Sequence, residues 1–175
     1  MVELRFLRNA QCERENCVST YRAIRYTATG VFGYEYVDEN GIMVCQNSSV
    51  FIPDAPIMLK GFGYELSSRL CSLNTNVYQT IDDLEGRTIA YIQIKGPNKY
   101  FLKFYNMEME IVTDATSYNF YVDNSLIVSI FKNRQPYTEN GSYYDKEKMF
   151  DITVWTELEP VVLLVVFNIP SLILQ

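Results

Sequence analysis

The stretch that decides the fold occupies residues 160–174 and reads PVVLLVVFNIPSLIL. Its uninterrupted apolar run, 161–167, is far shorter than the roughly 20 residues that a helix needs to cross a bilayer. Because the run is apolar on every side, it must be buried all round in either a strand or a helix. The β-branched valines favour a buried strand. Pro160, preceded by Glu157 and Glu159, is instead typical of the start of a helix. The residues alone leave both forms open.

Outside this stretch, strand patterns dominate the chain. Residues 107–111 and 150–154 alternate apolar and polar side chains with a period of two, which predicts strands with one buried face and one wet face. Aromatic residues make up 14% of the chain, and this also favours β structure. The expected strands are 20–27, 31–37, 42–46, 57–66, 77–81, 88–95, 100–105, 107–112, 119–122, 126–132 and 150–155.

A hairpin pattern of strand, Asp, tight turn and strand occurs three times. Its aspartates are Asp38, Asp82 and Asp123, which lie 44 and 41 residues apart. We expect Asp to end each first strand and Gly or Asn, such as Asn40-Gly41, to adopt a positive φ. A repeat of this length can also indicate propeller blades. The chain has room for at most about four blades and no Trp-Asp signature, so a meandering barrel fits better.

The order of these pieces resembles the tubby C-terminal-like group, which includes the LURP-one-related proteins and the phospholipid scramblases. Residues 31–46, 84–134 and 149–169 carry the resemblance, about two thirds of the chain. It implies an all-β fold with one core helix: a closed antiparallel β-barrel of about twelve strands around a hydrophobic C-terminal helix. On this reading the apolar run is the helix, and residues 1–175 form one domain. The palmitoylation and calcium-binding segments of scramblases have no counterpart, so scrambling activity is not implied.

Composition excludes several classes of function. The chain has no histidine, which excludes catalytic triads, general bases and metal sites that use histidine. Its 15 Lys and Arg against 21 Asp and Glu give a net charge of −6, which argues against a nucleic-acid binder. The same balance argues against avid binding to anionic membranes, although a local basic patch could survive it. Residues 1–8 mix charged and apolar side chains and form no secretory signal, so we expect a cytoplasmic protein.

The four cysteines are Cys12, Cys17, Cys45 and Cys71. They lack the paired CxxC spacing of a zinc ribbon, so we expect structural or free thiols and no bound zinc; a disulfide stays open. Two glycosylation sequons begin at Asn47 and Asn140, and without a signal peptide we interpret them as chance matches.

Candidate site residues are few. In tubby proteins, phosphoinositide headgroups bind basic side chains on the barrel surface, so the resemblance draws attention to Lys95, Lys99 and Lys103 as candidate ligand-binding residues. No individual position matches that motif, and the ordinary alternative is solvated strand-edge and loop charges. Carboxylate pairs such as Asp82-Asp83 and Glu108/Glu110 fit turn formation and a wet strand face better than acid–base chemistry.

The sequence therefore predicts a non-enzymatic intracellular binding or scaffold module without a cofactor. Its partner would be a lipid headgroup, by family resemblance only, or another protein. The alternative is a hydrolase on a β-sandwich that uses carboxylates alone, as some glycosidases do. Two carboxyl groups about 5–10 Å apart in a buried cleft would favour the hydrolase, and a basic concavity would favour the lipid module.

Overall fold

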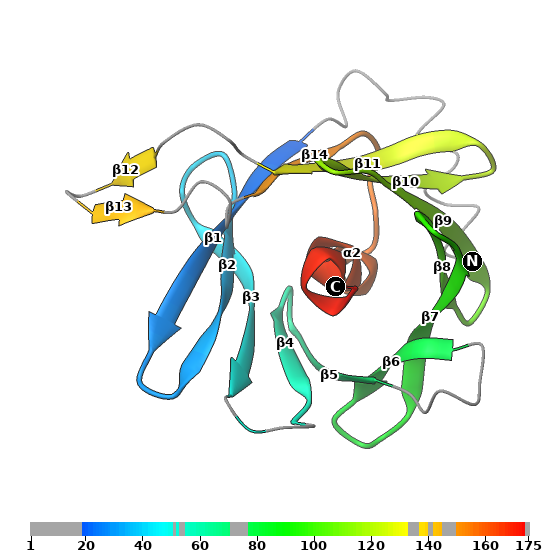
Figure 1. Ribbon diagram of the computed structural model, residues 1–175, viewed down its shortest axis with the longest axis horizontal. Coiled ribbons are helices and arrows are strands. Elements are labelled where there is room, and N and C mark those ends of the chain that lie inside the picture. Colours follow the sequence, from blue (N-terminus) through cyan, green and yellow to red (C-terminus); the bar gives the residue numbers. More distant parts are fainter. Residues whose placement is uncertain are drawn as a thin grey trace.

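The computed structural model describes residues 19–50, 52, 55–70, 77–132, 137–139, 142–144 and 150–173. These residues form a closed antiparallel barrel of twelve strands, and the helix α2 (Pro160–Leu172) lies inside it (Figure 1). The predicted fold class is confirmed, and the apolar run is a helix.

The strands follow each other round the barrel almost in chain order. The exception is β14, which lies between β1 and β11 and so closes the barrel. A separate two-stranded ladder joins β12 to β13. The strands are β1 (Ser19–Ala28), β2 (Val31–Val37), β3 (Met43–Val50), β4 (Ile57–Gly61), β5 (Tyr64–Leu70), β6 (Val77–Asp83), β7 (Thr88–Gly96), β8 (Lys99–Phe104), β9 (Met107–Thr113), β10 (Ser117–Val122), β11 (Ser125–Lys132), β12 (Tyr137–Glu139), β13 (Ser142–Tyr144) and β14 (Phe150–Val154).

The period-two patterns place the side chains as expected. In β9, Met107, Met109 and Ile111 are buried, whereas Glu108 is exposed on the outer face. The three apolar residues of β14 are buried in the same way. One predicted strand is wrong: 57–66 is divided into β4 and β5 by a turn at Phe62 and Gly63, which adopt φ values of 52° and 86°.

The helix is the centre of the core. Leu164 and Val166 are completely buried, although they point in different directions around the helix. Leu163 is only half-buried, because it borders a small cavity near the start of β1. Pro170 lies inside the helix, which nevertheless continues to Leu172. Burial on almost every side explains why an apolar run without amphipathic pattern forms this element.

The turns of the three predicted hairpins share one end of the barrel. Antiparallel neighbours alternate in direction, so the β2–β3, β6–β7 and β10–β11 turns lie together. The predicted turn at Asn40-Gly41 is confirmed, and Gly41 adopts a φ of 77°. In the second hairpin, Asp83 rather than Asp82 takes the role that Asp38 has in the first.

Candidate functional site

The three candidate lysines lie on one hairpin of the barrel wall. Lys95 is near the end of β7, Lys99 begins β8, and Lys103 lies further along β8. Lys95 and Lys103 approach the same ring, with their Nζ atoms 5.0 and 5.9 Å from the Phe101 centroid. Such cation–π contacts contribute about 0.5–1 kcal/mol at exposed sites. The structure therefore brings two of the lysines together around an aromatic side chain.

Two of these lysines are paired with carboxylates of β9. Lys103 Nζ lies 3.1 Å from Glu108 Oε2, and Lys99 Nζ lies 3.7 Å from Glu110 Oε2. The Lys103 side chain is only 27% exposed, compared with 49% for Lys99. The outer face of β8 and β9 is thus largely compensated in charge, and Lys103 is the least available of the three lysines.

The more basic surface is at the end of the barrel where β5 and β7 end and β8 begins. Arg69, Lys95 and Lys99 lie at this end, and so do two apolar residues, Leu70 and Ile94, which are 68% and 51% exposed. We call these five residues the basic rim. Exposed apolar side chains mixed with cations are typical of surfaces that contact a membrane interface.

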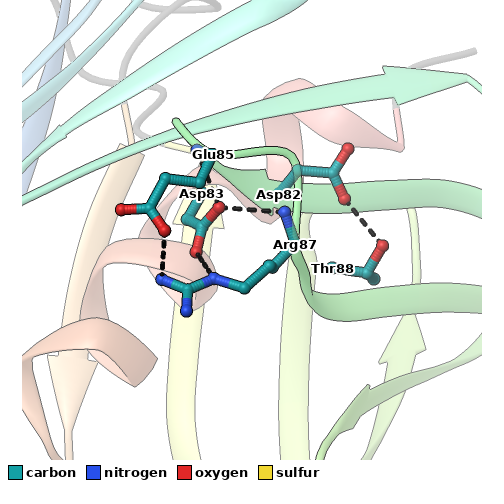
Figure 2. A network of polar contacts seen from close by, with 5 residues as sticks. All are labelled: Asp82, Asp83, Glu85, Arg87 and Thr88. Atoms are coloured by element: carbon teal, nitrogen blue, oxygen red, sulfur yellow. Dashed lines mark hydrogen bonds and ion pairs between the residues drawn. The ribbon is translucent and has the colours of Figure 1, made fainter.

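The opposite end of the barrel is acidic. It holds the aspartate turns and the segment that leads into α2, with Asp38, Glu39, Asp82, Asp83, Glu85, Asp123, Glu157 and Glu159. Figure 2 shows the Asp83 turn. Asp83 Oδ1 accepts from the backbone N–H groups of Glu85 and Arg87, both at 2.9 Å, and Oδ2 accepts from Arg87 Nε at 2.8 Å. Asp82 Oδ1 instead accepts from the Thr88 hydroxyl at 2.9 Å.

These carboxylates stabilise turns of the backbone. Hydrogen bonds from the Arg87 backbone lower the pKa of Asp83, and those from Thr116 and Ser117 lower the pKa of Asp114. A general acid needs a raised pKa instead. None of the described Asp or Glu residues is among the buried polar residues of the structure. Asp83 and Asp114 therefore have the environment of turn residues rather than that of a general acid.

Of the four cysteines, only Cys45 lies in the part of the chain that the structure describes. Cys45 is buried in the barrel wall, where desolvation raises the pKa of its thiol to about 12, so it is inert at neutral pH. Cys12, Cys17 and Cys71 lie outside the described residues. Among the residues that the structure does describe, no three His, Cys, Asp or Glu side chains gather closely enough to hold a metal ion.

A buried polar cluster joins α2 to the wall. Asn47 Nδ2 donates to Asn168 Oδ1 at 2.7 Å, to Ser171 Oγ at 3.1 Å and to Tyr36 Oη at 3.2 Å. Asn47 is 2% exposed and faces the barrel interior, so this sequon is not accessible in the folded chain. The feature of the sequence that indicates this cluster is a polar residue, Asn47, at an inward-facing strand position two residues after Cys45. The second sequon, at Asn140, lies outside the described residues.

Two larger cavities are found in the described part of the barrel besides the small one that Leu163 borders. The first, of about 480 Å³, is a groove on the outer face of β1, β2 and β14 in which Arg22 pairs with Asp151 at 3.3 Å. The second, of about 510 Å³, lies at the end of α2 beside β4, β5 and β6. Gln79 is among its lining residues and donates from Nε2 to the Leu172 carbonyl at 3.0 Å. Nothing in the sequence singles out Gln79, because its role depends on where the helix ends relative to β6.

Comparison with known proteins adds no family to this description. No family model, curated protein or solved structure matches the chain. Within the described part of the chain, no helix has the length and apolarity that crossing a membrane requires.

Proposed function

We propose that the protein is a non-enzymatic binding module that docks on anionic lipid headgroups through its basic rim. The observation that carries the proposal is the exposure of Leu70 and Ile94 at the same end of the barrel as Lys95, Lys99 and Arg69. The apolar side chains would enter the headgroup region while the cations approach the phosphates. The turns of Asp38, Asp83 and Asp123 lie at the other end, so most of the acidic turns face away from the membrane, whereas the Asp114 turn is at the end of the basic rim.

The proposal uses two of the three candidate lysines. Lys95 and Lys99 belong to the basic rim, whereas Lys103 is paired with Glu108 at 3.1 Å and lies nearer the acidic end. The ion pair of Lys99 with Glu110 is longer, at 3.7 Å, and its side chain is more exposed. An exposed pair of this kind contributes little by itself, so Lys99 can exchange Glu110 for a phosphate.

Vesicle flotation tests the proposal. The protein is mixed with vesicles of phosphatidylcholine alone or with added phosphatidylserine or a phosphoinositide, and the bound fraction is measured. We expect binding only to the anionic vesicles. The double variant Lys95→Gln/Lys99→Gln should bind more weakly by about 2 kcal/mol, or roughly 30-fold, since each cation near the surface contributes about 1 kcal/mol.

Lys60 provides a matched control. It is an exposed lysine paired with Glu65 at 3.7 Å, the same distance as the Lys99 pair, but it lies toward the acidic end. Lys60→Gln should therefore leave vesicle binding unchanged. Equal flotation with neutral and anionic vesicles, or an equal loss in Lys60→Gln and Lys99→Gln, would contradict the proposal.

A further inference from the structure

The groove on the outer face of β1, β2 and β14 arises because β1 pairs over different lengths with its two neighbours. β14 pairs with β1 from Ser19 onward, whereas β2 pairs with it only from Arg22, which is opposite Val37. After Val37 the chain turns at Asp38 toward β3. Residues 19–21 therefore have β14 on one side and the β2–β3 turn on the other, and the groove lies at this place. Its volume of about 480 Å³ is within the usual range for ligand pockets, roughly 300–1,000 Å³.

The charge of the groove is mainly negative. Among its described lining residues, Asp38, Glu39 and Asp151 carry carboxylates and Arg22 is the one cation. Arg22 Nε lies 3.3 Å from Asp151 Oδ1, so the guanidinium compensates one of the three carboxylates. Asp38 and Glu39 leave negative charge in excess, and the groove is therefore complementary to a cation.

Of these two carboxylates, one is fixed and the other is exposed. Asp38 Oδ1 accepts from the backbone N–H groups of Asn40 and Ile42 at 2.9 and 3.0 Å, so the turn holds this side chain in place before any ligand binds. Glu39 is exposed, and its Oε1 lies 3.5 Å from the Thr20 nitrogen. This is a long contact, which a cation can replace.

Apolar side chains follow the acidic lining in the sequence. Gly41 lines the groove, and the next two residues, Ile42 and Met43, are 61% and 49% exposed. The turn itself depends on aspartate and glycine, so it does not require large apolar side chains at these two positions. Ile24 and Val37 are among the lining residues as well. The groove thus offers apolar contacts next to its carboxylates.

We propose that this groove binds a segment of a partner protein in which Lys or Arg stands next to an apolar residue. The cation would lie at Asp38 and Glu39, and the apolar side chain would pack against Ile42. Charge complementarity favours this occupant over an acidic peptide or an anionic lipid, which the carboxylates would repel. The site differs from the membrane contact proposed above, because it lies toward the acidic end and needs neither Lys95 nor Lys99.

The test uses the synthetic peptide acetyl-Leu-Lys-Leu-Lys-Leu-amide, titrated into the isotope-labelled full chain and followed by NMR. We expect saturable shifts of the backbone amides of Thr20, Glu39 and Gly41. One control peptide has Glu in place of Lys, and a second has Ser in place of Leu. Each should bind at least about tenfold more weakly, since the first reverses the charge and the second removes the apolar contacts. Added salt should weaken binding of the Leu-Lys peptide, because exposed charges are screened.

Two variants with the same change of charge locate the site. Glu39→Lys turns an attraction into a repulsion and should weaken binding of the Leu-Lys peptide about tenfold. Glu85→Lys is the matched control, since Glu85 is exposed at the same end of the barrel but belongs to the β6–β7 turn and does not line the groove. It should change the affinity by no more than about twofold, as expected for a screened charge outside the contact. Thermal melting checks that both variants fold.

The proposal is overturned by any of three results: no saturable shift with the Leu-Lys peptide, equal affinity for either control peptide, or an equal loss of binding in Glu39→Lys and Glu85→Lys. Self-association of the protein that Glu39→Lys abolishes would assign the groove to a second copy of the chain, and this would overturn the proposal too. Vesicle flotation of the Lys95→Gln/Lys99→Gln variant is independent of these results, so the two proposals can fail separately.

Discussion

At the residue scale, the turn aspartates act on the backbone next to them. Asp38 Oδ1 accepts from the N–H groups of Asn40 and Ile42, and Asp83 and Asp114 make corresponding bonds. The short carboxylate reaches donors two to four residues further on, which is why Asp recurs where these strands turn. In Asp83 and Asp114 these bonds lower the pKa, so the two carboxylates stabilise their turns while they stay ionised.

Asp83→Ala should lower the melting temperature at neutral pH. The variant loses the two hydrogen bonds that the carboxylate accepts from the backbone N–H groups of Glu85 and Arg87, and also its bond with the Arg87 side chain. The pKa of Asp83 is lowered in the folded chain from its ordinary value of 3.8. The stabilisation is therefore fully present above pH 3.8 and is lost as the pH falls through the lowered pKa. The measurement is the difference in melting temperature between wild type and variant across this pH range.

Asp82→Ala serves as the control, since its carboxylate accepts from the Thr88 hydroxyl rather than from the backbone. It should change the melting temperature much less. A difference between wild type and Asp83→Ala that stays constant down to the lowest pH would contradict the turn role of Asp83.

At the element scale, α2 is fixed in the barrel by polar contacts as well as by apolar packing. Asn168 directly follows the apolar run 161–167, and it accepts from Asn47 and donates to the Leu164 carbonyl at 2.6 Å. Asn47 Oδ1 also accepts from the Tyr34 N–H at 3.0 Å. Apolar packing alone is not directional, and these bonds define the rotation and depth of the helix.

A double-mutant cycle tests this connection. Asn47→Leu is nearly isosteric but leaves Asn168 Oδ1 and the Tyr34 N–H without their partner, and each orphaned group costs about 1–3 kcal/mol. Asn47→Leu/Asn168→Leu removes both sides of the central bond, so it should cost less than the sum of the single variants. We expect a coupling energy of about 1 kcal/mol or more from urea unfolding. Additive losses would mean that the two asparagines do not interact.

The Asn47–Asn168 bond shows what the sequence could and could not predict. Period-two alternation and turn residues predicted most of the strands, because both signals are local. The helical form of 160–172 came from the family resemblance, since a run that is apolar all round suits a strand or a helix equally. The Lys103–Glu108 pair follows from the two-residue turn between β8 and β9 and was accessible from the sequence. Gln79 and its cavity require the packed position of α2, which no local pattern encodes.

At the scale of the whole molecule, strand alternation separates the charges. Each pair of strands returns the chain to the same end, so the turns of Asp38, Asp83 and Asp123 gather there, whereas the Asp114 turn between β9 and β10 lies at the other end. The basic rim and the cavity at the end of α2 share the other end. The groove beside the β2–β3 turn lies toward the acidic end. Both proposed binding surfaces thus depend on one arrangement: a barrel closed around a helix that runs from the acidic end to the basic end.

That arrangement is tested most directly by deleting residues 160–175 and following the thermal melt by circular dichroism. Nine residues of α2 are buried. Burial of a large apolar side chain contributes about 1.5–3 kcal/mol, so the lost burial is comparable to the whole stability of a domain, about 5–15 kcal/mol. We predict no cooperative melt for the truncated chain, and the same result for full-length Leu164→Asp. A truncated chain that melts cooperatively near the temperature of the intact protein would contradict the central role of the helix.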